Sequence, residues 1–242
     1  MSDEGLRAPR VAIDGPAGAG KSTVSRLVAE RLGFLLLDTG ALYRCIALAA
    51  KEAGVEWSDE ARMGALAQAI AAREGIRFEA VTSGVPRILL DGKDVSTAIR
   101  TQDIAQGASK VSALPAVRDA LLDLQRAAAR PGGVVLEGRD IGTVVLPDAE
   151  AKFFLTASVD VRAGRRYQEL TAKAPAPTLD DVLRDVRERD TRDTTRPVAP
   201  LKQADDAVLI ESSQMTIDEV VTFIVERVKA VAATGAPSSG TP

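Results

Sequence analysis

Residues 15–23 of this chain read Gly-Pro-Ala-Gly-Ala-Gly-Lys-Ser-Thr, which fits the pattern G-x-x-x-x-G-K-[ST] of a phosphate-binding loop. A short apolar run at residues 11–13 precedes the stretch, and an apolar-periodic segment begins after it at Val24. This order predicts a strand, a glycine-rich loop and a helix. Glycines let successive backbone N–H groups converge on a phosphate at the positive end of the helix. The sequence therefore predicts a nucleoside triphosphate site made by Gly15, Pro16, Ala17, Gly18, Ala19, Gly20, Lys21, Ser22 and Thr23.

Two side chains of this loop have distinct expected roles. Lys21 can reach the β- and γ-phosphates, and the Ser22 hydroxyl can ligate Mg²⁺, with phosphates and water completing the metal's shell. Asp14 and Asp38 are both candidates for a water-mediated contact with the metal, and either could instead cap a strand end. The competing dinucleotide pattern G-x-G-x-x-G fails, because its third glycine would fall on Thr23.

Composition narrows the class of protein. A chain of 242 residues with 45% apolar and 27% charged residues fits a globular α/β domain with insertions. A net charge of −3 argues against a general nucleic-acid-binding surface, and no apolar run approaches the ~20 residues of a membrane span. The lone Cys45 is expected in the core, and the absence of histidine and asparagine excludes imidazole catalysis and the N-K-x-D guanine motif. Residues 1–10 lack a signal core, so we expect a cytoplasmic protein.

Alternation of apolar and amphipathic runs predicts an α/β fold with a parallel five-stranded sheet in a three-layer α/β/α arrangement of the P-loop type. The expected strands cover residues 11–14, 35–38, 134–137, 152–155 and 207–210. A capping box formed by Thr216 and Glu219 predicts the start of the last helix. The predicted folded domain spans residues 10–231, between a flexible N-terminus at residues 1–9 and a disordered tail at residues 232–242.

Two insertions interrupt the alternation. At residues 76–95 the pattern changes to an antiparallel piece with a hairpin turn at Asp91-Gly92, followed by helices near residues 101–112 and 115–130. The second insertion, residues 160–196, carries nine cations and eight carboxylates. Such a charge-rich helix pair is often only a solvated face. Helical spacing nevertheless groups Arg162, Arg165 and Arg166 on one face and Arg189, Asp193 and Arg196 on another, which ends where Pro197 must break the helix.

This supply of arginines favours phosphoryl transfer to a small acceptor over nucleotide-driven motion. Transfer between two nucleotides brings several phosphates together, and guanidinium groups from a closing segment would neutralise their charge. A motor ATPase would instead show a hydrophobic strand that ends in a Walker-B acid. Here the strand at residues 134–136 ends in Glu137-Gly138-Arg139-Asp140.

Four blocks of sequence together resemble the bacterial cytidylate kinase family. The blocks are residues 15–23, residues 37–44 (LDTGALYR), residues 137–145 (EGRDIGTVV) and residues 188–200, which begin ERD and end RPVAP. They occur in order within residues 11–228. The resemblance implies transfer of a phosphoryl group from ATP to CMP or dCMP with Mg²⁺, in pyrimidine nucleotide metabolism. It also implies a monomer that binds small-molecule nucleotides and neither nucleic acid nor membranes.

The resemblance implies roles for individual residues. It makes residues 39–132 the monophosphate-binding region and residues 160–196 a lid with its flanking helices. Lys21, Arg165, Arg166 and Arg196 would serve catalysis, with Arg165 and Arg166 on the lid. Position 39 carries threonine where serine is equally expected, and the resemblance gives Glu137 no role. Thr39, Tyr43 and Arg44 would lie on the acceptor side. The other expected contacts with the acceptor are Arg44, Arg139 and Arg196 for the phosphate; Ser109, Arg118 and Asp140 for the base; and Arg189 and Asp193 for the sugar.

The base assignment has a chemical rationale. Cytosine carries an exocyclic amine, which can donate a hydrogen bond to a carboxylate such as Asp140. Beside the amine lie hydrogen-bond acceptors of the base, to which Arg118 can donate. Uracil reverses the donor and the acceptor that these side chains would meet, at a cost of roughly 1–3 kcal/mol per unpaired group. Two other hypotheses remain at this stage: a P-loop kinase with a different small acceptor, and a nucleotide-gated regulatory protein without acceptor turnover.

Overall fold

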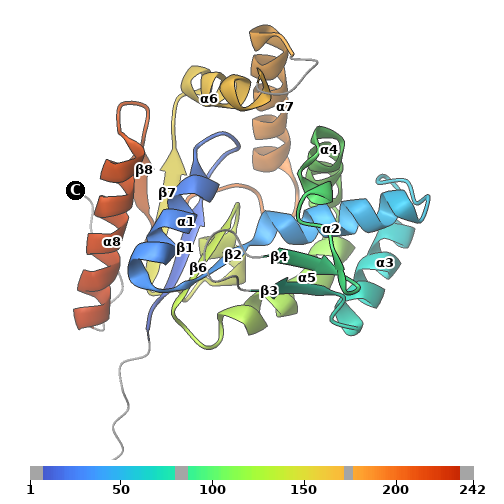
Figure 1. Ribbon diagram of the computed structural model, residues 1–242, viewed down its shortest axis with the longest axis horizontal. Helices are drawn as coiled ribbons and strands as arrows, with labels where there is room; N and C mark the ends of the chain where they lie inside the picture. The colour runs from blue at the N-terminus through green and yellow to red at the C-terminus, as the bar shows by residue number, and fades with distance from the viewer. Residues whose placement is uncertain (1–7, 80–86, 172–176, 235–242) are drawn as a thin grey trace, which may run out of the picture. The chain divides into compact units, whose positions relative to one another are not determined.

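The computed structural model describes residues 8–79, 87–171 and 177–234 (Figure 1). The chain divides into two compact units. The loop unit comprises the described residues of Met1–Leu36 and Pro131–Pro242, and the inserted unit comprises those of Leu37–Arg130. Each unit has its own hydrophobic core.

A five-stranded sheet with the order β2-β6-β1-β7-β8 forms the centre of the loop unit. β1 pairs in parallel with both β6 and β7, and β8 pairs in parallel with β7. Val11, Ala12 and Ile13 of β1 are fully buried, as expected for a central strand covered on both faces. The predicted parallel sheet is confirmed, with strand ends that differ from the expected ones by at most one residue. The strands are β1 (Arg10–Asp14), β2 (Leu35–Asp38), β6 (Val134–Gly138), β7 (Ala151–Thr156) and β8 (Val208–Glu211).

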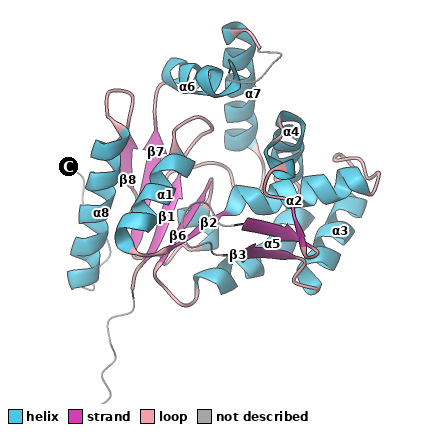
Figure 2. Cartoon of the chain, viewed as in Figure 1, coloured by secondary structure: helices cyan, strands magenta, loops and turns pink. Residues whose placement is uncertain are grey.

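Helices α1 (Lys21–Leu32) and α8 (Ile217–Thr234) pack together on one face of this sheet (Figures 1 and 2). The predicted capping box of α8 is present, because Glu219 N–H donates to Thr216 Oγ1 at 3.3 Å and Thr216 N–H donates to the Glu219 carboxylate at 2.7 Å. α8 continues to Thr234, so the helix extends past residue 232, where the sequence predicts a disordered tail. Residues 235–242 of that predicted tail lie outside the described residues.

The charge-rich insertion forms two helices, α6 (Val159–Thr171) and α7 (Leu179–Thr195). They share a small apolar core around Ala163, Val182 and Val186. α7 ends at Thr195, which confirms the helix break predicted at residue 197. Apolar packing therefore joins two helices whose exposed surfaces are dominated by charge.

The described residues of the inserted unit form four α-helices, a short 3₁₀ helix and a three-stranded antiparallel sheet with the order β3-β4-β5. The predicted hairpin is confirmed: β4 and β5 pair across Asp91-Gly92, whose φ angles of +50° and +81° match a turn with two left-handed residues. Residues 80–86 of the predicted antiparallel piece lie outside the described residues. The elements are α2 (Thr39–Glu52), α3 (Glu60–Ala72), β3 (Ile76–Glu79), β4 (Arg87–Leu90), β5 (Lys93–Asp94), the 3₁₀ helix Ala98–Arg100, α4 (Gln102–Val111) and α5 (Pro115–Ala129).

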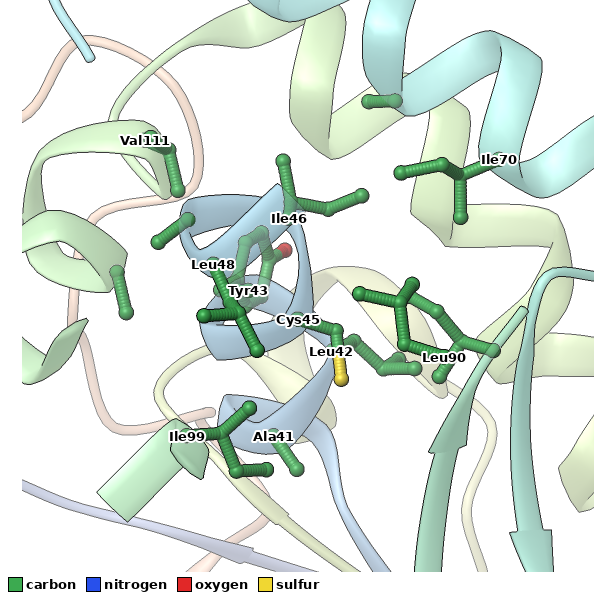
Figure 3. Close-up of a cluster of buried hydrophobic side chains, with 14 of the residues drawn as sticks. Ala41, Leu42, Tyr43, Cys45, Ile46, Leu48, Ile70, Leu90, Ile99 and Val111 are labelled. Atoms are coloured by element: carbon green, nitrogen blue, oxygen red, sulfur yellow. The ribbon is translucent and has the colours of Figure 1, made fainter. Parts of the chain in front are cut away.

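Helix α2 lies at the centre of the inserted unit's core. Leu42 and Ile46 of this helix are fully buried and belong to one cluster with Ile70 and Leu90 (Figure 3). Cys45 is also fully buried there, as the sequence predicts. Burial raises the pKa of its thiol to about 12, so Cys45 is a core residue with little thiolate character.

Candidate active site

The loop between β1 and α1 needs glycine at defined positions. Gly15 has φ +149°, and a Cβ added there would lie 1.9 Å from the backbone carbonyl oxygen of Leu155. Gly18 has φ +77°, and its added Cβ would lie 2.9 Å from the carbonyl oxygen of Arg162. Gly20 adopts the left-handed region as the residue before the first turn of α1. The chain therefore turns sharply into the helix, and the loop lies against β7 and α6.

Lys21 is buried at the first position of α1. Its ammonium group donates to the carbonyl oxygen of Pro16 at 2.7 Å, across the loop. Burial lowers the pKa of Lys21 well below its ordinary value, and the charge of Arg139 lowers it further, while Glu137 acts in the opposite direction. A triphosphate placed at the positive end of α1 would supply the negative charge that this ammonium group needs.

The side chains around Ser22 fit a metal ion that takes most of its ligands from a bound nucleotide and from water. Ser22 is exposed in the first turn of α1. Within the described residues, no group of three or more His, Cys, Asp or Glu side chains could hold a metal ion. Mg²⁺ commonly keeps several waters and takes few protein ligands beside substrate phosphates. The loop therefore fits a metal that Ser22 holds together with phosphate oxygens and water.

Asp14 occupies the end of β1 and serves a different purpose. Its two carboxylate oxygens accept from the backbone N–H groups of Ile141 and Gly142, at 2.8 and 2.7 Å. These residues begin a π-helical turn, Ile141–Val145, which directly follows Arg139-Asp140. Burial raises the pKa of Asp14 to about 6, against the effect of these two hydrogen bonds. Of the alternatives that the sequence leaves open for Asp14, these contacts favour the structural cap over the water-mediated metal contact.

The three arginines that the sequence groups on α6 have different partners. Arg162 donates to the carbonyl oxygens of Ala17 and Ala157 and forms a bidentate ion pair with Asp190. Arg165 donates to the carbonyl oxygens of Ala19 and Ser212, at 3.3 and 2.8 Å. Arg166 forms an ion pair with Glu169 one turn along the helix, at 3.0 Å. Arg162 and Arg165 thus contact the phosphate loop itself, whereas Arg166 pairs on the surface of α6.

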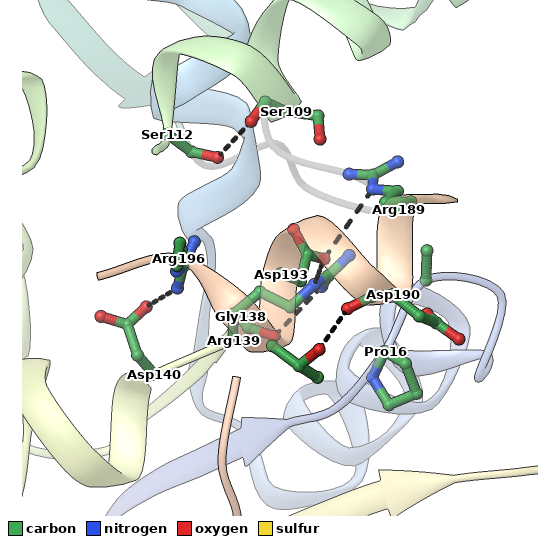
Figure 4. A network of polar contacts seen from close by, with 12 residues as sticks. Pro16, Ser109, Ser112, Gly138, Arg139, Asp140, Arg189, Asp190, Asp193 and Arg196 are labelled. Atoms are coloured by element: carbon green, nitrogen blue, oxygen red, sulfur yellow. Dashed lines mark hydrogen bonds and ion pairs between the residues drawn. The ribbon is translucent and has the colours of Figure 1, made fainter. Parts of the chain in front are cut away.

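On α7, Asp193 is the centre of a cluster of positive charge (Figure 4). Arg139 contacts its carboxylate at 2.8 Å and Arg189 at 4.0 Å. Burial raises the pKa of Asp193, but the charges of Arg139, Arg189 and Arg196 outweigh burial and hold this pKa below its ordinary value. Three residues that the sequence assigns to the acceptor thus lie together within the loop unit.

Arg196 and Asp140 form a second buried pair in the loop unit, at 3.5 Å (Figure 4). Their side chains are 3% and 6% exposed. Arg196 also donates to the carbonyl oxygen of Ala199 at 2.5 Å, which fixes its guanidinium group just after the end of α7. The structure therefore brings together two residues that the sequence assigns to the acceptor's phosphate and base.

In the inserted unit, Asp38 begins α2. Its carboxylate accepts from Ala41 N–H at 3.2 Å and forms an ion pair with Arg44, six residues later. Thr39, the first residue of the helix, is buried. Asp38 therefore caps α2 and orients Arg44, a residue that the sequence assigns to the acceptor's phosphate.

The residues expected at the base also include a group in the inserted unit. Arg118 is 6% exposed, lies 5.6 Å over the ring of Tyr43 and donates to the carbonyl oxygen of Ser112 at 3.1 Å. Ser109 is buried on α4. A Cβ at Gly107 would approach the Trp57 ring to 2.6 Å, so Trp57 packs tightly against this helix. Arg118 and Tyr43 thus form a preorganised cationic and aromatic pair.

Sequence reasoning did not single out Asp190 or Ser212. Asp190 belongs to the Glu188-Arg189-Asp190 block, and its spacing from Arg162 gives no signal, because the two residues lie on different helices. Ser212 follows β8 and accepts from Arg165 through its backbone oxygen at 2.8 Å and through its Oγ at 3.3 Å. Only the fold reveals these two partners of the lid arginines.

Comparison with known proteins supports a single family. The family model described as "Cytidylate kinase" matches residues 11–230. A protein of Pseudomonas aeruginosa named cytidylate kinase is 51% identical over 218 residues, which cover 90% of this chain and 93% of that protein. A protein of the same name from Pelotomaculum thermopropionicum is 49% identical over 222 residues, which cover 92% and 96% of the two chains.

The solved structure of shikimate kinase from Acinetobacter baumannii in complex with shikimate is also similar. It has 16% identity and a TM-score of 0.46, and it covers 95% of this chain and 98% of its own. No helix among the described residues combines the length and the apolar character needed to cross a bilayer. The family match covers nearly the whole of both units, including the phosphate loop, the Arg139-Asp140 turn and both helices of the charge-rich insertion. The chain belongs to the cytidylate kinase family.

Proposed function

We propose that this chain transfers the γ-phosphoryl group of ATP to CMP or dCMP, giving ADP and CDP or dCDP. The identity of about half of all residues with proteins named cytidylate kinase, over nine-tenths of the chain, carries this proposal. The geometry of the phosphate loop supports it, because Lys21 and the first turn of α1 suit a triphosphate. The reaction would place the chain in pyrimidine nucleotide metabolism.

On the donor side, residues 15–23 would bind the phosphates of ATP through backbone N–H groups and the Lys21 ammonium. Ser22 would contribute one oxygen to Mg²⁺, which supplies charge neutralisation on the transferring phosphates when it is bound. The lid arginines Arg165 and Arg166 would add positive charge near the leaving group. Arg165 already contacts the loop in this structure, because it donates to the carbonyl oxygen of Ala19.

On the acceptor side, we assign the phosphate to Arg44, Arg139 and Arg196. Each of them is paired with an aspartate of its own unit in this structure: Arg44 with Asp38, Arg139 with Asp193 and Arg196 with Asp140. These carboxylates would keep the guanidinium groups oriented before the substrate arrives, and preorganisation of this kind lowers the entropic cost of binding. Thr39 and Tyr43 would complete this side of the site.

The nucleoside would be read by two further groups of residues. Ser109, Arg118 and Asp140 would contact the base, and Arg189 and Asp193 the sugar. Asp140 would accept from the exocyclic amine of cytosine, and Arg118 would donate to the ring acceptors. We also propose residues 39–132 as the monophosphate-binding region, a range close to the compact inserted unit Leu37–Arg130.

The chemistry needs little acid–base assistance from the protein. The attacking group is a phosphate oxygen of the acceptor that is already anionic, so the lack of histidine in this chain costs nothing. Rate acceleration would come from alignment of the two phosphates and from neutralisation of the charge that builds up between them. The side chains that we assign to that task are Lys21, Arg165, Arg166 and Arg196.

An ADP-release assay with a panel of acceptors tests the proposal. We expect turnover with CMP and dCMP to exceed that with UMP, AMP, GMP and shikimate, and Lys21→Ala to abolish it. Turnover with AMP equal to or above that with CMP would reject the acceptor assignment. ATP binding without any acceptor-dependent ADP release would reject the kinase activity altogether.

The variant Asp140→Asn isolates the contact with the base. Because Asp140 also orients Arg196, its loss should slow the reaction with every acceptor, and only the ratio of CMP to UMP turnover reports base reading. We expect this ratio to fall by about one to two decades. The exposed Asp148, which pairs with Arg10, provides a matched Asp→Asn control. An unchanged ratio in Asp140→Asn would show that this carboxylate does not read the amine.

A further inference from the structure

Arg162 is buried, whereas Arg165 and Arg166 on the same helix are partly exposed. Its side chain is 5% exposed. Nε donates to the carbonyl oxygen of Ala157 at 2.9 Å, and Nη1 donates to the carbonyl oxygen of Ala17 at 3.0 Å. Nη1 and Nη2 also donate to the two carboxylate oxygens of Asp190, at 2.9 and 2.6 Å. Four of the five N–H groups of a guanidinium are thereby used, so Arg162 has little left to offer a phosphate.

The contact with Ala17 determines which way the phosphate loop faces. In a trans peptide the carbonyl and the following N–H point in opposite directions. When Arg162 holds the Ala17 carbonyl, it therefore turns the N–H of Gly18 away from α6. Arg165 holds the Ala19 carbonyl at 3.3 Å and turns the N–H of Gly20 in the same manner. The two arginines contact the loop on the side opposite these two N–H groups.

Gly18 makes this support possible. A Cβ at this position would lie 2.9 Å from the backbone oxygen of Arg162 and 3.1 Å from its Cβ. The backbone of residues 17–19 thus rests directly on the first turns of α6. This close approach gives a second reason for glycine at position 18, beside its φ of +77°.

Asp190 extends the support to α7. Its carboxylate holds both Nη groups of Arg162, and it lies on the helix that carries Arg189 and Asp193. A bidentate Arg–carboxylate pair fixes direction as well as distance. Movement of α7 would therefore pull on Arg162 and, through it, on the Ala17 carbonyl. The ion pair connects the loop assigned to ATP with the helix assigned to the sugar of the acceptor.

We propose that Arg162, oriented by Asp190, is a positioning residue for the kinase reaction. It sets the phosphate loop for the triphosphate and couples that loop to α7. The inference rests on the proposed function and adds to it, because the resemblance assigns neither residue a role. Arg162 acts through the loop backbone, from the side that the phosphates do not occupy.

The experiment compares Arg162→Lys, Asp190→Asn and the double variant. Lysine keeps the charge but cannot hold Ala17, Ala157 and both oxygens of Asp190 at once. Binding of a non-hydrolysable ATP analogue is measured by calorimetry, and KM for ATP, KM for CMP and kcat are measured in the ADP-release assay. We expect the Kd of the analogue and the KM for ATP to rise about tenfold in either single variant. The double variant should be no worse than Arg162→Lys, because the two residues act as one unit.

A matched pair at the other end of β1 serves as the control. Arg10 forms a similar bidentate pair with Glu150, through Nε at 3.1 Å and Nη2 at 2.7 Å. Arg10→Lys and Glu150→Gln remove an ion pair of the same chemistry from the loop unit without touching the phosphate loop. We expect both control variants to bind the analogue as the wild type does.

The outcomes separate positioning from general stability and from the proposed activity. Analogue affinity within twofold of wild type in both Arg162→Lys and Asp190→Asn would overturn the inference, whatever their thermal stability. Equal losses in the Arg10 and Arg162 variants, or additive losses in the double variant, would overturn it as well. If the wild type fails to turn over CMP while the Arg162 variants still lose analogue binding, the positioning role stands and the proposed acceptor is wrong.

Discussion

Asp14→Asn gives a test of how the turn after β6 is held in place. In the folded protein, burial raises the pKa of Asp14 from its ordinary value of 3.8 to about 6. Between these two values the folded state holds a proton that the unfolded chain has released, so stability must fall as pH rises through this window. A difference of about two pKa units corresponds to about 3 kcal/mol of unfolding free energy, which is fully present below pH 4 and lost above pH 6.

Asparagine has nearly the same shape as aspartate and does not titrate. In the wild type, each oxygen of Asp14 accepts from one N–H group, of Ile141 or of Gly142. The asparagine side chain has a single oxygen for one of these groups, and its NH₂ donor would face the other. The variant should therefore have a lower free energy of unfolding than the wild type. The difference between the two should shrink as pH rises from about 4 to about 7, because only the wild type loses stability over this range. Urea unfolding followed by circular dichroism across this pH range measures the difference between the two proteins.

The control is Asp91→Asn in the hairpin of the inserted unit. A hydrogen bond from Arg73 lowers the pKa of Asp91, so its contribution is present above its ordinary pKa and is lost only at more acidic pH. The difference in unfolding free energy between the wild type and Asp91→Asn should therefore stay constant from about pH 5 to 7. A flat curve for Asp14→Asn in the same window, or one with the opposite slope, would refute the account of Asp14 as a buried cap with a raised pKa.

Three further outcomes are expected. Gly15→Ala should lower the free energy of unfolding by at least about 2 kcal/mol, because its Cβ would lie 1.9 Å from a backbone oxygen. Gly33→Ala is the control: Gly33 has a positive φ but open space around it, so this variant should lose less stability in the same thermal melt. Thr216→Ala removes the cap of α8 and should cost about 1 kcal/mol by chemical denaturation, whereas no measurable loss would contradict the capping box. Cys45 should resist an aromatic disulfide reagent at pH 8 until the inserted unit unfolds, and rapid labelling of the native protein would contradict its burial.

Local patterns were sufficient to predict the fold. The strand at residues 35–38 and the hairpin at Asp91-Gly92 follow from short-range chemistry, namely apolar runs between turn signals and a turn that needs two left-handed residues. The end of α7 before Pro197 follows from the ring of proline. Strand ends shift by a residue, because hydrogen bonds to neighbouring strands decide them.

The pairings among the candidate site residues could not be predicted from the sequence. Helical spacing places Arg162, Arg165 and Arg166 on one helix, as α6 confirms, but it does not distinguish their partners. The structure instead gives Arg162 to Asp190, Arg165 to the loop and Arg166 to Glu169. Such partners come from different helices and loops, so no sequence period encodes them. The sequence offers a cap as one alternative for Asp14, but it could not identify the partners, because these N–H groups lie on the order of 130 residues away.

The position of β1 in the sheet has a consequence for synthesis on the ribosome. This strand is made first, yet its two neighbours, β6 and β7, follow it by on the order of 120 to 140 residues. At about 5–20 residues per second, the N-terminal strand waits roughly 6–30 seconds for a partner. The inserted unit has meanwhile left the ribosome with its whole core, so the nascent chain should acquire a protease-resistant middle before its first strand is protected.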